Sequence, residues 1–204
     1  MLYKNGVEQM EDKKLMDNAG FLVNGDGIRY LITHECDCCP DNRKYLEVNP
    51  LIEENISSVS LDICVGRYLW EFKDKKITHF DSSKDNIKEF LEKYTRKYDL
   101  VEDLGGKLVI HKDQFFLLEI FEEIKFNRHV SGHILGKSSI GRLGLIIQTA
   151  SIINPMQKQK LILEIKNISP ITLAFHYRDP IAQIQFYYFP KPIEKHYQKY
   201  GLFK

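Results

Sequence analysis

The chain has 204 residues, of which 43% are hydrophobic, and its 29 basic and 28 acidic residues give a net charge of +1. This length and composition can bury a substantial core within one domain. The near-zero charge argues against a nucleic-acid binder that relies on a general positive field, so any anion site must be local. The sequence has neither a signal-peptide core nor an apolar run of membrane-spanning length, which predicts a soluble, cytoplasmic protein without membrane contact.

The first 46 residues carry no motif that indicates a function. We interpret residues 1–46 as an N-terminal extension that packs on the domain formed by residues 47–204. Within the extension, residues 9–18 have the pattern of a short helix that ends near Gly20.

Three of the four cysteines gather in one short segment, as Cys36, Cys38 and Cys39. Their spacing suits neither a disulfide framework nor the usual paired zinc ligands, so we predict reduced thiols and no metal site. Zinc held by these three cysteines and His34 is the alternative, because thiolates and imidazole are the ligands that zinc prefers. A metal assay on protein without a histidine tag distinguishes the two.

A second helix is predicted near residues 83–97, followed by strands. Four apolar residues there have helical spacing after the candidate caps Ser82 and Ser83: Ile87, Phe90, Leu91 and Tyr94. From Phe115 onward, short apolar and β-branched runs alternate with the turn-like segments FNRH, NPMQKQ, NISP and YRDP. This rhythm is typical of an all-β sandwich or barrel, so the residues alone predict an all-β domain with two helices.

The most informative segment is GHILGKSSIGRLGLIIQTASIINP, residues 132–155. It resembles the motif of dCTP deaminases, GRSSLARLGL followed by a Thr-Ala pair and an Ile-Asp-Pro-Gly turn. The matching residues are Ser138, Ser139, Arg142, Leu143, Gly144, Leu145, Thr149 and Ala150. Further blocks agree in order and spacing: SVSLDICVG (58–66), FFLLEIFEEIKF, LILEIKN with Glu164, and RDPIAQIQF with Gln183. The resemblance to the dCTP deaminase family spans roughly residues 47–190.

The resemblance implies a mainly β fold of the dUTPase type (β-clip): a distorted β-barrel with jelly-roll character and a few helices. It also implies a homotrimer with active sites between subunits, a dCTP- or dUTP-type substrate, and Mg²⁺ that accompanies the triphosphate. No zinc is expected, and the HxE and PCxxC patterns of zinc deaminases are absent.

Deamination of cytosine needs an activated water at C4, a proton for the ring nitrogen and a proton for the departing ammonia, and one carboxylate that moves protons can serve all three needs. In LILEIK, period-two alternation puts Glu164 on the face opposite Leu163 and Ile165. Without the family match, a solvated strand glutamate is the favoured interpretation. With it, Glu164 is the predicted general acid and base.

The remaining site residues follow from the resemblance. It implies that Ser138 and Arg142 hold the catalytic water, that the backbone at Ala150 contacts the base, and that Gln183 belongs to the substrate site. The phosphate-facing candidates are Lys137, where the family usually has arginine, and Ser139. In the C-terminal tail, Lys199 and Tyr200 resemble the Lys-Tyr pair that closes over the triphosphate, and a disordered basic tail is the alternative.

One turn departs from the family pattern. The family's Ile-Asp-Pro-Gly-Phe-x-Gly appears as INPMQKQ, so Asn154 replaces an aspartate, and Met156 and Gln159 replace two glycines. In dUTPases that aspartate activates water, which an amide cannot do, whereas contact with the sugar hydroxyl survives the change. The turn is therefore either strained or rebuilt.

These observations predict hydrolysis of dCTP to dUTP and ammonia. Two alternatives stay open. One is a bifunctional enzyme that forms dUMP, a class that often contains SSIGRLG as this chain does. The other is a catalytically degenerate nucleotide-binding or regulatory protein of the same fold.

Overall fold

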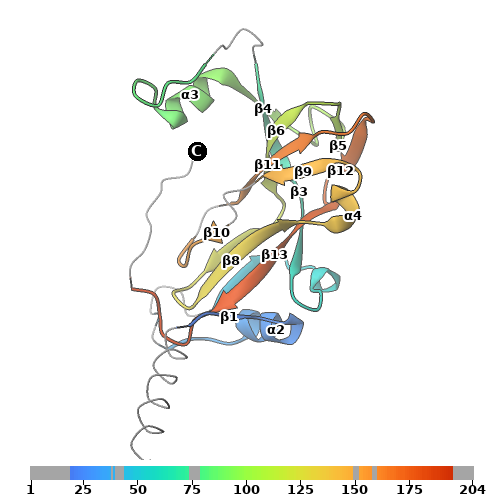
Figure 1. The fold of residues 1–204 in the computed structure, drawn as a ribbon. Helices are drawn as coiled ribbons and strands as arrows, with labels where there is room; N and C mark the ends of the chain where they lie inside the picture. The colour runs from blue at the N-terminus through green and yellow to red at the C-terminus, as the bar shows by residue number, and fades with distance from the viewer. Residues whose placement is uncertain are drawn as a thin grey trace, which may run out of the picture.

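The computed structural model describes residues 19–37, 39, 44–73, 79–148, 152–157 and 160–194. Strands are the predominant regular structure in this part of the chain (Figure 1). In chain order the elements are β1 (Phe21–Leu22), α2 (Gly25–Thr33), β2 (Leu46–Asn49), the 3₁₀ turn η1 (Glu53–Asn55), β3 (Leu61–Phe72), α3 (Ile87–Tyr94), β4 (Thr95–Asp99), β5 (Lys107–Ile110), β6 (Phe115–Ile120), β7 (Glu123–Phe126), β8 (Val130–Gly136), α4 (Ser138–Gly141), β9 (Leu145–Gln148), β10 (Ile152–Ile153), β11 (Ile162–Asn167), β12 (Leu173–His176) and β13 (Pro180–Tyr188).

Nine of the strands form one antiparallel sheet in the order β10-β8-β13-β3-β6-β11-β9, with β1 on β13 and β4 on β3. Two further pairs, β12 with β5 and β2 with β7, form small sheets of their own. The predicted mainly β fold of the dUTPase type is confirmed. None of the helices in the described segments is both long and apolar enough to cross a bilayer.

The long strand β3 joins the two halves of the large sheet. Its first residues pair with β13, and its second half pairs with β6 and β4. The register shifts between Val65 and Leu69, where a Cβ on Gly66 would lie 2.2 Å from the carbonyl oxygen of Glu119. Only glycine allows this close approach of two backbones, and the irregularity lets one strand serve both halves of a bent sheet.

The core lies between the inward faces of these strands. Period-two alternation buries Leu163 in β11 and Ile184 and Phe186 in β13, whereas consecutive residues are buried in β3 and β6, including Ile63 and Leu118. The cluster extends to Ile28 and Leu31 of α2, so the segment before β2 packs on the same core as the strands.

The helices differ from the sequence prediction. Helix α3 begins at Ile87 because the side chain of Asn86 accepts hydrogen bonds from the backbone N–H groups of Lys88 and Glu89, at 2.9 and 3.3 Å. The predicted caps Ser82 and Ser83 instead lie in the turn before it. The helix predicted for residues 9–18 lies outside the described residues.

Helix α2 was not predicted, although it has an Asn cap. The side chain of Asn24 accepts a hydrogen bond from the N–H of Gly27 at 2.9 Å. The helix contains two glycines and several β-branched or aromatic residues, which have low helix propensity. Burial of Ile28 and Leu31 against the sheet outweighs that preference.

Candidate active site

A polar cluster lies where β8 ends and α4 begins. The ammonium group of Lys137 forms an ion pair with the carboxylate of Asp62 in β3. Gln183 in β13 accepts a hydrogen bond from the Ser60 hydroxyl at 2.9 Å and donates one to the carbonyl oxygen of Gly136 at 3.2 Å. The structure thus brings together three of the sequence blocks that resemble dCTP deaminases.

Helix α4 presents the hydroxyl and guanidinium candidates to solvent. Its one buried residue, Ile140, anchors the turn to the core, while Ser138, Ser139 and Arg142 are exposed. The backbone N–H of Arg142 donates to the Ser138 carbonyl oxygen at 3.1 Å, which fixes the spacing of the two residues. These three side chains are accessible to a ligand or to another subunit.

Glu164 lies in the middle of β11, between β6 and β9, where it faces Leu117 and Gln148 in register. As predicted, Leu163 and Ile165 on either side are buried, and Glu164 points to the other face. Its carboxyl group is half-buried, and its Oε2 atom has no hydrogen-bond partner among the described residues. Burial raises the pKa of Glu164 above its ordinary value, because desolvation disfavours the charged form. A raised pKa favours uptake of a proton by this carboxyl group, as general acid–base catalysis requires.

Within one chain, Glu164 and α4 do not meet. Strand β9 pairs with β11 so that Leu145, close after Arg142, lies opposite Asn167, whereas Gln148 lies opposite Glu164. Three residues along a strand correspond to about 10 Å. In the part of the chain that the structure describes, no hydrogen bond or ion pair joins Glu164 to Ser138 or Arg142.

The altered turn keeps a conformation that normally needs glycine. The N–H of Gln157 donates to the carbonyl oxygen of Asn154 at 3.3 Å, with Pro155 and Met156 between them. Met156 has φ of +65°, in the left-handed region that favours glycine. Of the two alternatives, a strained or a rebuilt turn, the structure supports the strained one at Met156. Gln159 lies outside the described residues.

Three of the predicted site residues also lie outside the described part of the chain: Ala150, Lys199 and Tyr200. Conversely, sequence reasoning did not assign Ser60 and Asp62 to the site. Both belong to SVSLDICVG, one of the blocks that resemble the family, and that resemblance was the available signal. The position of Asp62 beside Lys137 could not be predicted from the sequence pattern, because the pairing of β3 with β13 creates this contact.

Comparison with known proteins identifies the family. The family model described as dCTP deaminase-like matches residues 37–189. A dCTP deaminase, dUMP-forming, from Nanoarchaeum equitans is 32% identical over 170 residues, covering 78% of this chain and 84% of that protein. A protein of the same name from Corynebacterium glutamicum is 30% identical over 155 residues, covering 74% of this chain and 77% of its own.

Among solved structures, the 2′-deoxycytidine 5′-triphosphate deaminase from Agrobacterium tumefaciens superposes with a TM-score of 0.60 at 18% identity. The match covers 83% of this chain and 48% of that one, so the chain spans about half of the length of that structure. At this identity the likeness establishes the fold. The sequence comparisons establish the family: the chain belongs to the dCTP deaminase-like family.

Proposed function

We propose that this chain deaminates dCTP, bound as its magnesium complex, and that it releases dUMP as the final product. The observation that carries the proposal is Glu164, a half-buried carboxyl group at the family's glutamate position, with a raised pKa and an oxygen that has no hydrogen-bond partner among the residues that the structure describes. A buried polar atom without a partner costs stability, and such groups concentrate at functional sites.

In the proposed reaction Glu164 accepts a proton from water while the water oxygen bonds to C4 of the cytosine. The same carboxyl group delivers this proton to the ring nitrogen N3. Glu164 then takes the proton of the C4 hydroxyl group and delivers it to the amino group, so that the C4–N bond breaks, ammonia leaves and the C4 carbonyl of uracil forms, while N3 keeps its proton. One water is consumed and one ammonia released, and Glu164 returns to its starting state.

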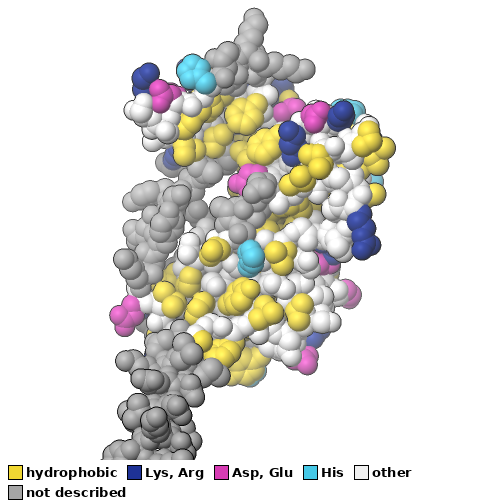
Figure 2. Space-filling view, in the orientation of Figure 1, with side chains coloured by type: hydrophobic (Ala, Val, Ile, Leu, Met, Phe, Trp, Pro, Cys, Tyr) yellow, Lys and Arg dark blue, Asp and Glu magenta, His cyan; other side chains and the backbone are white. Residues whose placement is uncertain are grey.

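Ser138 and Arg142 position the water in this proposal, and they come from a neighbouring subunit of a homotrimer. Two features of the chain support the assignment. Both side chains are exposed and lie apart from Glu164 of the same chain. Large apolar side chains are also exposed near them, namely Leu143 at 47% and Ile168 at 53%, and Ile152 of β10 is exposed at 69%. Hydrophobic side chains also spread across the face that carries β8 and β13 (Figure 2). Apolar surface of this kind is typical of subunit interfaces.

Lys137 and Ser139 bind the triphosphate, with Lys199 and Tyr200 closing over it. The ammonium group of Lys137 already has a carboxylate partner in Asp62, so a phosphate oxygen must share it or replace Asp62. Gln183, whose amide bonds Ser60 and Gly136, keeps the end of β8 in place for the same ligand. Ala150 supplies a backbone contact to the base and Asn154 a hydrogen bond to the sugar.

The names of the relatives favour dUMP as the product, which requires a second hydrolysis that releases pyrophosphate from dUTP. Asn154 favours the other candidate, release of dUTP, since an amide cannot serve as the base for that step. In the dUMP-forming proposal another group, such as the carboxylate of Asp62 beside Lys137, must activate the second water.

The test is incubation of the purified protein with Mg²⁺ and dCTP, with dCTP, dUTP, dUMP and ammonia measured over time. A parallel incubation with dUTP isolates the second step. The dUMP-forming proposal predicts dUMP and pyrophosphate from dCTP, whereas dUTP that accumulates without dUMP selects the second candidate. Binding of dCTP without ammonia release would overturn both and support the degenerate regulatory interpretation.

A further inference from the structure

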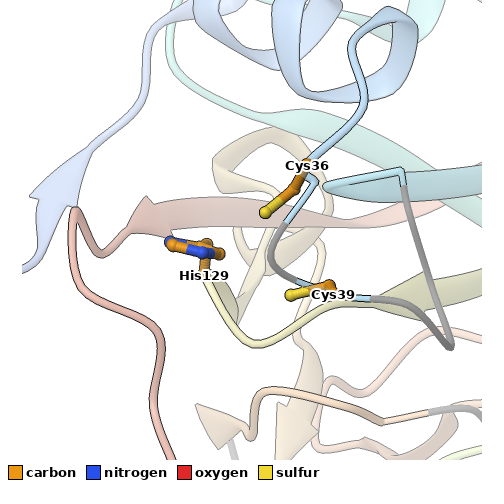
Figure 3. Close-up of side chains that lie close together, drawn as sticks. All are labelled: Cys36, Cys39 and His129. Carbon is orange, nitrogen blue, oxygen red and sulfur yellow. The ribbon is translucent and has the colours of Figure 1, made fainter.

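A cluster of metal-ligand side chains lies at the opposite end of β8 from Lys137. Cys36 and Cys39 follow α2, and His129 immediately precedes β8 (Figure 3). All three are buried, with exposed fractions of 5%, 5% and 4%. One ligand atom from each lies within 4.8 Å of the other two. Because the seven residues of β8 span about 23 Å, this cluster is remote from Lys137 and α4.

We propose that Cys36, Cys39 and His129 bind a structural Zn²⁺ ion. Three atoms within 4.8 Å of one another share a point no more than about 2.8 Å from each. The bonds that zinc forms are about 2.3 Å to sulfur and 2.0 Å to nitrogen, so side-chain shifts below about 1 Å complete the contacts. When Cys38 is set aside, Cys36 and Cys39 have the C-x-x-C spacing of zinc knuckles, which was not recognised when the three cysteines were considered together.

The hydrogen bond of His129 favours metal binding. Its Nδ1 atom lies 2.7 Å from the carbonyl oxygen of Phe189. A carbonyl oxygen only accepts hydrogen bonds, so Nδ1 carries the proton and the neutral ring has its lone pair on Nε2. Histidine ligands of zinc are typically oriented by this kind of hydrogen bond to a backbone carbonyl.

Charge balance also favours a divalent ion. Zn²⁺ binding displaces one proton from each thiol, and two thiolates then neutralise the ion inside a buried site. The aromatic ring of Tyr45 packs edge-on against His129 at 5.6 Å, and that of Tyr188 stacks on it at 5.8 Å. These rings shield the site from solvent. A water or another group beyond these three side chains completes the tetrahedron.

The cluster differs from the one considered from the sequence. His34 is exposed, stacks on Tyr30 at 3.8 Å, and has its Nδ1 atom 3.1 Å from the Tyr30 carbonyl oxygen. Cys38 lies outside the described residues. His129 is about ninety residues from the cysteines in sequence, so only the fold brings it to them. Zinc at this position joins the segment after α2 to the turn between β7 and β8. This link closes a long loop of the chain and so restricts the conformations of the unfolded state.

The test is the metal content of untagged protein expressed with zinc in the medium, measured by mass spectrometry after dialysis. We expect about one Zn²⁺ per chain. Protein stripped by a chelator under reducing conditions should regain, with Co²⁺, the visible bands of tetrahedral cobalt and a thiolate charge-transfer band. Its thermal midpoint should fall on stripping and recover with Zn²⁺.

Variants make the assignment residue by residue. Cys36→Ser, Cys39→Ser and His129→Gln should each lower the zinc content at least about tenfold. Cys64→Ser is the matched control. Cys64 is also a buried thiol, but it lies in β3, outside the cluster, and its sulfur accepts a hydrogen bond from the side chain of Asn55. It should keep the full zinc content.

Two results would overturn the proposal. One is folded wild-type protein that holds no zinc and gives no cobalt bands, whether its cysteines are reduced or oxidised. This result does not depend on how well any variant folds. The other is zinc retained at the wild-type level by all three ligand variants. Neither readout uses deaminase activity, so the zinc proposal stands or falls independently of the proposed reaction.

Discussion

Glu164 combines a functional role with a cost to stability. Since burial raises its pKa, the folded protein binds this proton more tightly than the unfolded chain does. The resulting stabilisation is fully present below the unfolded pKa and is lost as the pH rises through the folded pKa. At pH values above the folded pKa, burial of the ionised Glu164 carboxylate therefore destabilises the folded protein.

We predict that Glu164→Gln abolishes ammonia release and raises the thermal midpoint at pH 8. The gain should shrink as the pH is lowered through the raised pKa of Glu164, because the wild-type carboxyl group then becomes neutral like the amide. Glu92→Gln, on the exposed face of α3, is the control and should change neither property. A Glu164→Gln variant that still deaminates dCTP would remove this residue from the mechanism.

Met156 is a second residue at which local energetics are unfavourable. A non-glycine residue with φ of +65° costs about 1 kcal/mol or more, and the flexibility of glycine in the unfolded chain offsets part of that. We predict that Met156→Gly raises the free energy of unfolding by up to about 1 kcal/mol relative to Met156→Ala, measured by urea denaturation. Alanine is the proper reference because it removes the same side chain and keeps the strain. Equal stability of the two variants would show that the turn is not strained.

The residue-level prediction of the site depended on motif order. Ser138, Arg142 and Glu164 were nominated because several blocks match one family, and the alternation in LILEIK gave the correct face for Glu164. The partners of these residues could not be predicted in the same way. The Lys137–Asp62 pair and the cluster of Cys36, Cys39 and His129 arise from strand pairing between distant segments.

At the scale of elements, the turn-like segments were the reliable signals. FNRH connects β7 to β8, NISP follows β11, and YRDP connects β12 to β13, as turn chemistry predicts. Helix boundaries were less predictable, since Asn86 displaced two serines as the cap of α3. Helix α2 went unrecognised because its stability comes from burial rather than from intrinsic propensity.

The junction between α4 and β9 depends on one glycine. Gly144 has φ of +87°, and a Cβ there would lie 2.5 Å from the Cβ of Ser169. Its carbonyl oxygen accepts a hydrogen bond from the N–H of Ile168 at 2.9 Å, which ties the junction to the end of β11. The position of Arg142 relative to the sheet therefore rests on this contact.

We predict that Gly144→Ala lowers the free energy of unfolding by about 2 kcal/mol and impairs turnover, because strain and steric overlap add at this site. Gly141→Ala is the matched control three residues away: a Cβ there meets no atom within 4 Å, and its φ is not positive. It should be neutral or slightly stabilising, since alanine favours a helix. Chemical denaturation and dCTP turnover of both variants test the prediction, and equal effects would contradict it.

At the scale of the whole molecule, the separation of Glu164 from α4 has a testable consequence. If each active site takes Glu164 from one subunit and Arg142 from a neighbour, neither side chain needs a partner in its own chain. A symmetric ring of subunits can then repair two different defects by mixing, because some interfaces combine the intact half of each variant.

We predict that Glu164→Gln and Arg142→Ala are each inactive as pure proteins and regain activity when unfolded together and refolded as a mixture. Random assembly places both intact residues at about a quarter of the interfaces, so the mixture should approach a quarter of the wild-type rate. The control is the double variant refolded with either single variant. In each such mixture every chain carries the same one of the two substitutions, so no site has both intact residues and the mixture should stay inactive. A mass tag on one of the two variants, read by native mass spectrometry of the mixture, establishes that hybrid oligomers form. Hybrid trimers without activity would place Glu164 and Arg142 in the same subunit's site, and the exposed apolar residues near α4 would then need another partner.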